Sequence, residues 1–152
     1  MEIRLTLALP RDKASVPFVR RILASSMQVL GVQSSVISDI ELALTEACTN
    51  VLDHADHADE YEVSVGIDGD RCVIEVIDRG GGFDGSMQGL ASAPLTAEDG
   101  RGIQLMRALV DCVTFASRPH VGTVVHLEKH LEWDANAAIK QLTEGREGAE
   151  PV

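Results

Sequence analysis

The chain has 152 residues, of which 45% are hydrophobic, and 13 basic residues against 24 acidic ones give a formal net charge of −11. This length suits one domain with its own core and is too short for two substantial domains. The acidic balance argues against attraction to nucleic acid or anionic lipid. No apolar run approaches the roughly 20 residues that span a bilayer. We therefore expect a protein that acts on a protein partner or small ligand, with no direct nucleic-acid or membrane contact.

Cysteine usage and the N-terminal segment both indicate a reducing compartment. The three cysteines, Cys48, Cys72 and Cys112, are scattered among apolar neighbours and lack the spacing of a zinc site. The first residues, MEIRLTLALP, lack the basic patch, apolar block and small-residue cleavage site of a secretory signal. We therefore expect a cytoplasmic protein with buried thiols.

A strand and a helix are predicted at the N-terminus. Residues 3–9, IRLTLAL, alternate between apolar and polar side chains, which is typical of a half-buried strand, and Pro10 follows them. Ser15 and Pro17 mark the start of a helix, and Gly31 marks its end. This helix is expected to turn its apolar residues toward the core, namely Phe18, Val19, Ile22, Leu23, Met27 and Leu30.

A second helix is predicted to end near Ala55. Two starts are open, because Ser34 or Ser35 can cap it, while Ser38 with Glu41 fits a capping box one turn later. Its apolar stripe is expected to be buried and comprises Ile40, Leu44, Ala47 and Val51.

A polar stripe follows the same helix. Glu46, Asn50 and His54 are spaced by four residues, so they share one side at the border of the core. The amide oxygen of Asn50 suits a hard cation, and the carboxylate of Glu46 can accept a proton. Taken alone, such a stripe is more often a solvated flank. His54 and His57 at the helix end are likewise more typical of surface residues than of zinc ligands.

Two strands and a glycine-rich segment come next. Residues 61–68 and 71–78 flank a Gly-Asp turn, which predicts a hairpin. Asp78 ends the second strand, where a carboxylate can accept a hydrogen bond from an exocyclic amine. Gly80 and Gly82 allow a close backbone approach that a Cβ would block. By itself this pattern is also typical of a strand that ends in a turn.

A second glycine motif precedes the last confident helix. From about residue 80 to residue 100 the sequence predicts a long loop of the kind used as a lid. Gly100, Arg101 and Gly102 then open a helix, whose unpaired N–H groups favour an anion such as phosphate. A plain helix cap is the alternative.

The remaining predicted elements are a helix and two strands, at residues 102–111, 112–117 and 122–130. We expect one domain over residues 1–131. The segment 132–152 is expected to be a tail, with a short helix capped by Asp134 before a disordered end.

Three segments in this order resemble the GHKL superfamily of ATP-binding domains. ELALTEACTNVLDHA at 41–55 resembles the N box, DRGGGFD at 78–84 the first glycine box, and GRGIQLM at 100–106 the second. The pattern ExxxNxxxHA in a short chain is most similar to bacterial anti-sigma-factor serine/threonine kinases. The resemblance covers about residues 2–130 and implies the Bergerat fold. That fold is an α/β (α+β) two-layer sandwich with a mixed, mainly antiparallel sheet, helices on one face and a long ATP lid.

The resemblance also implies roles for named residues. Asn50 would hold a Mg²⁺ ion, Glu46 would act as the base, and Asp78 would bind the adenine amine, with Thr123 beside it. Gly80 and Gly82 would shape the pocket floor. Residues 84–99 would form the lid, and the phosphates would meet Gly100, Arg101 and Gly102, with Arg101 also stabilising the transferred group.

The function implied is an ATP- and Mg²⁺-dependent protein kinase. It would phosphorylate a serine of a STAS-type anti-sigma-factor antagonist and sequester a sigma factor; the resemblance also allows a homodimer. Two alternatives stay open: a nonenzymatic regulator that binds a protein partner in response to ATP, and a detached histidine-kinase catalytic domain. The latter ranks lower because the segment before Glu46 has no room for a dimerisation hairpin.

Overall fold

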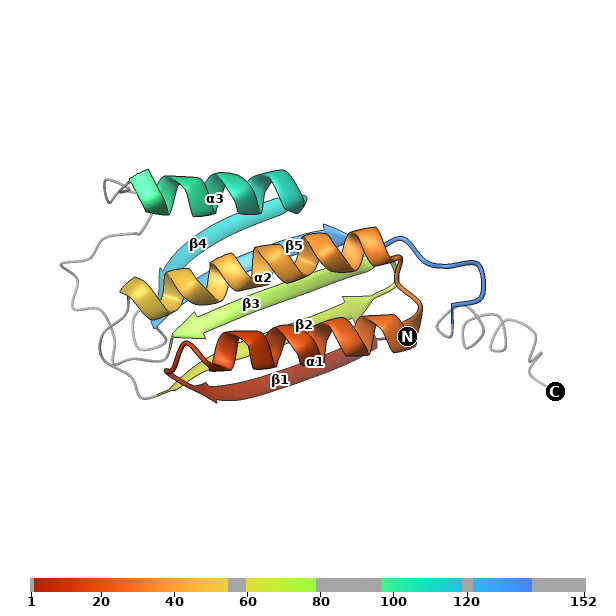
Figure 1. The fold of residues 1–152 in the computed structure, drawn as a ribbon, viewed down its shortest axis with the longest axis horizontal. Coiled ribbons are helices and arrows are strands. Elements are labelled where there is room, and N and C mark those ends of the chain that lie inside the picture. The colour runs from red at the N-terminus through yellow and green to blue at the C-terminus, as the bar shows by residue number, and fades with distance from the viewer. Residues whose placement is uncertain (1, 55–59, 79–96, 119–121, 138–152) are drawn as a thin grey trace.

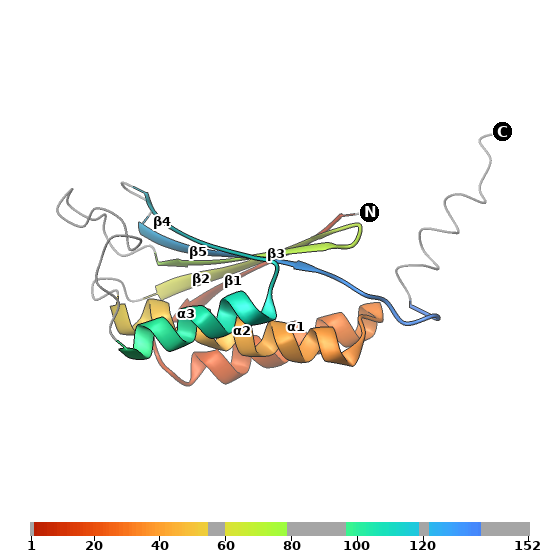
Figure 2. The ribbon, with the colours of Figure 1, turned by 90° about the horizontal axis from the view of Figure 1, so that it is seen from above.

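The computed structural model describes residues 2–54, 60–78, 97–118 and 122–137. In chain order its elements are β1 (Glu2–Pro10), α1 (Ser15–Leu30), α2 (Ser34–His54), β2 (Glu60–Asp68), β3 (Arg71–Asp78), α3 (Ala97–Leu109), β4 (Cys112–Arg118) and β5 (Gly122–His130). The strands form one sheet in the order β1-β2-β3-β5-β4. All three helices lie against one face of this sheet (Figure 1 and Figure 2). The predicted two-layer α+β fold is therefore confirmed.

The sheet is antiparallel at each pairing of the described strands, rather than mixed as the resemblance implies. The reason is the position of β5. The strands β3 and β4 are joined through α3 and run in the same direction (Figure 1), but β5 lies between them and pairs antiparallel with both. The two helices between β1 and β2 likewise return the chain so that these neighbours run in opposite directions.

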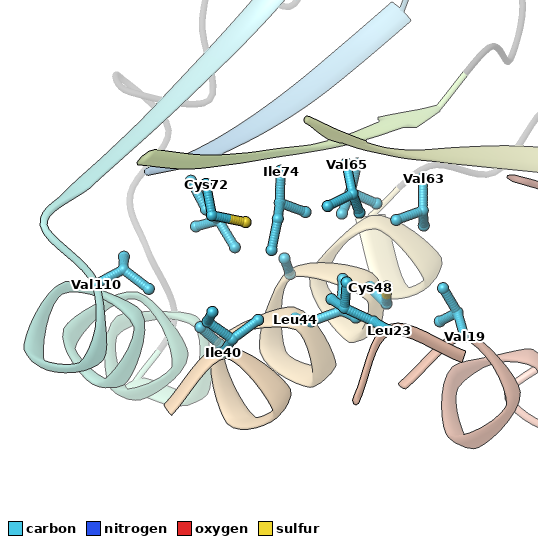
Figure 3. Close-up of a cluster of buried hydrophobic side chains, with 14 of the residues drawn as sticks. Val19, Leu23, Ile40, Leu44, Cys48, Val63, Val65, Cys72, Ile74 and Val110 are labelled. Atoms are coloured by element: carbon cyan, nitrogen blue, oxygen red, sulfur yellow. The ribbon is translucent and has the colours of Figure 1, made fainter. Parts of the chain in front are cut away.

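The core fills the space between the helices and the sheet (Figure 3). The predicted apolar stripe of α2 is confirmed, with exposed fractions between 0 and 2% for Ile40, Leu44, Ala47 and Val51. Alternate residues of β2 and β3 meet it from the sheet, among them Val63, Val65, Cys72 and Ile74. Each large apolar side chain buried here contributes about 1.5–3 kcal/mol relative to an exposed one. This packing fixes α2 against β3.

The first helix differs from the prediction in one buried position. Val19, Leu23 and Met27 are buried as expected, but Phe18 is 56% exposed. Because neighbouring residues on a helix are about 100° apart, the face that points Val19 at the sheet turns Phe18 toward solvent. Gly31 ends the helix at φ 91°, and its N–H donates to Gln28 O at 3.1 Å. That positive φ is the conformation glycine adopts without strain.

The boundaries of α2 and α3 settle two expectations. Of the two starts considered for α2, the structure has the earlier one, at Ser34. The helix α3 begins at Ala97, before the glycine motif, so Gly100 and Gly102 lie within the helix rather than ahead of it. Glycine's low helix propensity favoured the later start, but the packing of α3 against α2 outweighs it.

The end of the described chain packs on the domain. The indole N–H of Trp133 donates to Asp70 Oδ1 at 2.8 Å, and Ala137 is 1% exposed. The tail helix that was predicted after Asp134 falls almost wholly outside the described residues. Within those residues, no helix is long and apolar enough to cross a membrane.

Candidate functional site

The polar stripe of α2 lies where the sequence predicts it, at the edge of the core. Glu46 and Asn50 are both half-buried, one turn apart and flanking the fully buried Ala47. The helix is held by its apolar stripe, so these two side chains project from a fixed backbone. Glu46 lies on the side of α2 that borders the first turns of α3, and Asn50 follows it one turn later.

Glu46 lies against the backbone of Gly102 in α3. A Cβ added at residue 102 would come within 2.9 Å of the carboxylate oxygen Oε2 of Glu46. That separation is shorter than real carbon–oxygen contacts allow, so glycine is what permits the approach. The structure thus brings together two predicted site residues, Glu46 from the N-box-like segment and Gly102 from the segment that resembles the second glycine box.

Asp78 and Thr123 form a second pair. They are partners in the β3–β5 register, and their exposed fractions are 2% and 5%. They are the only charged or hydroxyl side chains that β3 and β5 bury at this end of the sheet within the described residues. A buried carboxylate next to a buried hydroxyl provides hydrogen-bonding groups of the kind that select a polar heterocycle.

Arg11 links this pair to α2, and sequence reasoning missed it. Its Nη1 donates to Asp78 Oδ2 at 3.1 Å, while Nη2 donates to Leu52 O at 2.8 Å and Val51 O at 3.3 Å. Asn50 is the residue immediately before these carbonyls, so the turn of α2 that carries it lies beside Asp78. The only local signal was a basic residue directly after the end of an apolar strand.

Comparison with known proteins decides the family. The sequence profile described as histidine kinase-like ATPase domain matches residues 9–129. This chain belongs to that family. Serine-protein kinase RsbW of Bacillus velezensis is 31% identical over 134 residues, covering 81% of this chain and 82% of the relative. Anti-sigma F factor of Thermoanaerobacter sp. is 32% identical over 128 residues, covering 77% and 86%.

A solved structure supports the fold of a histidine kinase-like ATPase domain. The crystal structure of the RsbU and RsbW domains of Rv1364c from Mycobacterium tuberculosis matches with a TM-score of 0.67 at 23% identity. The match covers 90% of this chain and 34% of that one. With the named relatives, it confirms the resemblance to anti-sigma-factor serine kinases, and the family implies the use of ATP.

The described side chains are of the types that a nucleotide with a bound metal ion would require. Asp78 supplies a buried acceptor for a base amine, and Asn50 supplies an amide oxygen of the kind that hard cations accept. The missing side chain at Gly102 leaves room for the carboxylate of Glu46 beside α3. These are the donor and acceptor types expected for such a ligand.

Other predicted site residues are less completely described. Arg101 lies on α3 and is exposed, and Gly100 is helical. Gly80, Gly82 and most of the predicted lid fall outside the described residues, as do the side chain of His54 and all of His57. Within the described part of the chain, no group of three or more metal-ligating side chains is gathered.

A hollow of about 360 Å³ lies on the open face of the sheet, away from the predicted site, and is lined by Arg4, Ser64 and Glu75 among others.

A buried polar cluster lies behind the site. Ser15 Oγ and the hydroxyl of Tyr61 are 2.5 Å apart, and Tyr61 also contacts the thiol of Cys48, two residues after Glu46. Burial raises the pKa of Cys48 to about 12, although its hydrogen bond with Tyr61 acts in the opposite direction. Burial also raises the pKa of Tyr61 to about 12. Cys48 is therefore a protonated, unreactive thiol near neutral pH, in agreement with the structural role expected from the sequence.

Proposed function

We propose that this chain transfers the γ-phosphate of ATP to a serine of a STAS-type anti-sigma-factor antagonist, and that it also binds a sigma factor. The observation that carries the proposal is the link between the two halves of the site. Arg11 joins buried Asp78 to the end of α2, and the same helix sets Glu46 against α3. One helix thereby connects a base-recognition group to a candidate proton acceptor.

Nucleotide binding is assigned to four described side chains. Asp78 accepts a hydrogen bond from the exocyclic amine of adenine, and Thr123 adds a hydroxyl beside it. Asn50 would hold Mg²⁺, which when bound offsets the negative charge of the phosphates. Arg101, near the start of α3, supplies positive charge for the transferred group. The glycines at 80, 82, 100 and 102 would keep the backbone close to the nucleotide.

The transfer step is assigned to Glu46. Its carboxylate accepts the proton of the serine hydroxyl as the hydroxyl oxygen attacks the γ-phosphorus. The bond between the γ-phosphorus and the bridging oxygen breaks, and ADP leaves with the electron pair. Gly102 leaves room for this carboxylate beside α3, because a Cβ at residue 102 would lie 2.9 Å from Oε2.

The proposed protein partners of this chain are taken from the names of its relatives. An anti-sigma factor binds a sigma factor, and a serine-protein kinase needs a protein substrate, here proposed to be a STAS-domain antagonist that competes with the sigma factor. We place this exchange in the cytoplasm and include a homodimer in the proposal. The net charge of −11 makes a direct role at nucleic acid unfavourable.

Two measurements test the proposal. Calorimetry with Mg²⁺ and ATP compares the wild type with Asn50→Ala and Asp78→Ala, and with Asp53→Asn as a control at an exposed position of α2. Both site variants should bind at least about tenfold more weakly, and the control should not change. Phosphotransfer from radiolabelled ATP to a purified STAS-domain protein is then measured with Glu46→Gln. Phosphoserine formed by the wild type and lost in Glu46→Gln supports the assignment.

Four results would overturn parts or all of it. Unchanged ATP binding by Asp78→Ala removes the adenine role, and full transfer by Glu46→Gln removes the base. ATP-dependent binding of the partner without phosphoserine makes the chain a nonenzymatic regulator, and phosphohistidine on a separate protein makes it a histidine-kinase domain.

A further inference from the structure

Arg11 has no step in the proposed reaction, although it joins Asp78 to the end of α2. It lies between the end of β1 and the start of α1, and its side chain is 13% exposed. Asp78, its ion-pair partner, follows it by 67 residues in the sequence. The contact therefore depends entirely on the tertiary fold.

The guanidinium divides its N–H donors between Asp78 and the end of α2. Nη1 faces the carboxylate of Asp78, while Nη2 faces two carbonyls in the last turn of α2, at Val51 and Leu52. The planar fork of arginine can serve both at once, whereas a lysine ammonium is a single point charge on a flexible stem. The cation also meets the partial negative charge at the C-terminal end of the helix. One side chain thus satisfies a buried carboxylate and the end of α2.

The backbone turn that carries Arg11 is itself held in place by hydrogen bonds. The N–H of Asp12 donates to Pro10 O at 2.8 Å, and Asp12 Oδ1 accepts from the N–H of Ala14 at 2.9 Å. The hydroxyl of Ser15 adds a bond to Asp12 O at 2.6 Å. These bonds fix the turn that projects the guanidinium toward Asp78.

We propose that Arg11 is a positioning residue that orients Asp78 for the exocyclic amine of adenine and so sets the preference for a 6-aminopurine nucleotide. The inference rests on the proposed function, because it takes Asp78 as the base-recognition group. A carboxylate buried to this extent needs a compensating partner, and the partner's position decides the direction in which its oxygens point.

The preference has a simple chemical origin. An ionised carboxylate only accepts hydrogen bonds, so it matches the amine of ATP and opposes the carbonyl that inosine triphosphate carries at the same ring position. A site built to pair with one such group rejects the analogue that lacks it. An Asp78 without the Arg11 contact would be less firmly oriented and would lose part of this discrimination, while the phosphate contacts of both nucleotides would be unaffected.

The test is the ratio of two dissociation constants. Binding of ATP and of inosine triphosphate, each with Mg²⁺, is measured for wild type, Arg11→Gln, Arg11→Lys, Asp78→Asn and the double variant Arg11→Gln/Asp78→Asn. Arg4→Gln is the matched control, because Arg4 is a highly exposed arginine that pairs with its near neighbour Glu2. We expect Arg11→Gln to lower the preference for ATP about tenfold or more and Arg11→Lys to lower it less. In the Asp78→Asn background, the Arg11 substitution should have no further effect on the ratio.

The outcomes separate this inference from the proposed function. If Asp78→Asn keeps the wild-type ratio, the adenine role of Asp78 is wrong. If Asp78→Asn loses the preference for ATP while Arg11→Gln and Arg11→Lys both keep the wild-type ratio, only the role of Arg11 is wrong. Equal weakening of both nucleotides by the Arg11 variants, with an unchanged ratio, would show that Arg11 acts only as a structural cap of α2. If Arg11→Gln does not fold, the nucleotide preference of Arg11→Lys is compared with that of wild type instead.

Discussion

The carboxylate of Glu46 lies beside Gly102 across the α2–α3 interface, where a Cβ at residue 102 would come within 2.9 Å of Oε2. Two segments that are far apart in the sequence therefore meet at this carboxylate. The glycine in this helix costs about 1 kcal/mol of helix propensity relative to alanine. Its presence is explained by the approach of Glu46, which any larger residue would displace.

Gly102→Ala should separate activity from stability. The added methyl group would lie 2.9 Å from Glu46 Oε2, so the carboxylate must move. We expect phosphotransfer to fall by about tenfold to a hundredfold, because a displacement of this size at a reacting group is costly. Alanine also favours the helix, so the melting temperature should stay unchanged or rise.

The matched control is Gly66→Ala. A Cβ at Gly66 meets nothing within 4 Å, so this variant should transfer phosphate at the wild-type rate. Equal activity of Gly102→Ala and wild type would mean that the position of Glu46 does not matter for the reaction.

Thr123→Val tests the buried hydroxyl beside Asp78. Valine keeps the shape of threonine but removes its hydrogen-bonding group, and Thr123 is 5% exposed. We expect ATP to bind about tenfold more weakly, with little change in the transfer rate at saturating ATP. Titration calorimetry and initial rates measure the two quantities. Thr114→Val, at an exposed position of the neighbouring strand β4, should leave both unchanged.

The sequence predicted the elements better than their contacts. The hairpin of β2 and β3 and the buried stripe of α2 follow from short-range periodicity, which is a local property. The polar stripe with Glu46 and Asn50 could be placed at the core border for the same reason. The family resemblance then supplied the ligand.

Contacts between distant segments could not be predicted in the same way. The pairing of Arg11 with Asp78 joins residues 67 positions apart, and no local pattern encodes it. The insertion of β5 between β3 and β4, which makes the sheet antiparallel, is also a matter of topology. The exposure of Phe18 depends on a rotation of α1 by one residue, within the usual uncertainty of an apolar face.

Stability should fall in alkaline solution because of the buried thiols. Burial raises the pKa of Cys48 to about 12 and that of Cys72 to about 12, from the ordinary value of 9.0. The unfolded chain therefore loses these protons first, so stability is complete below pH 9.0 and is lost as the pH rises toward 12. Each group contributes a slope of about 1.4 kcal/mol per pH unit within this window.

Cys72→Val removes one of these groups while keeping an apolar side chain of similar size. Urea unfolding at several pH values above 9.0 should give a shallower loss of stability than in wild type. Cys112→Val, outside the fully buried core, controls for the loss of a cysteine as such. A slope in Cys72→Val as steep as in wild type would show that Cys72 ionises equally in both states.

Lys129 should anchor the C-terminal end of α3. Its Nζ donates to Leu109 O at 2.7 Å and lies 3.4 Å from Asp39 Oδ2 on α2, with the lysine side chain 18% exposed. The ammonium thus satisfies a carbonyl at the end of α3 and ties that end to the neighbouring helix. Lys129→Met keeps most of the apolar stem but leaves this carbonyl without its donor. We expect a loss of about 1–2 kcal/mol in the free energy of unfolding, measured with urea.

The same change should reach the site through α3. The helix carries Arg101 and Gly102 near its other end, and a loosened anchor allows the whole element to shift against α2. Phosphotransfer should therefore fall by more than the small loss of folded protein can explain. Lys13→Met, at an exposed position before α1, is the matched control for removing a lysine charge and should alter neither quantity. A variant at Lys129 that loses stability but transfers phosphate at the full rate would limit the anchor to a structural role, because the position of α3 relative to Glu46 would then not depend on it.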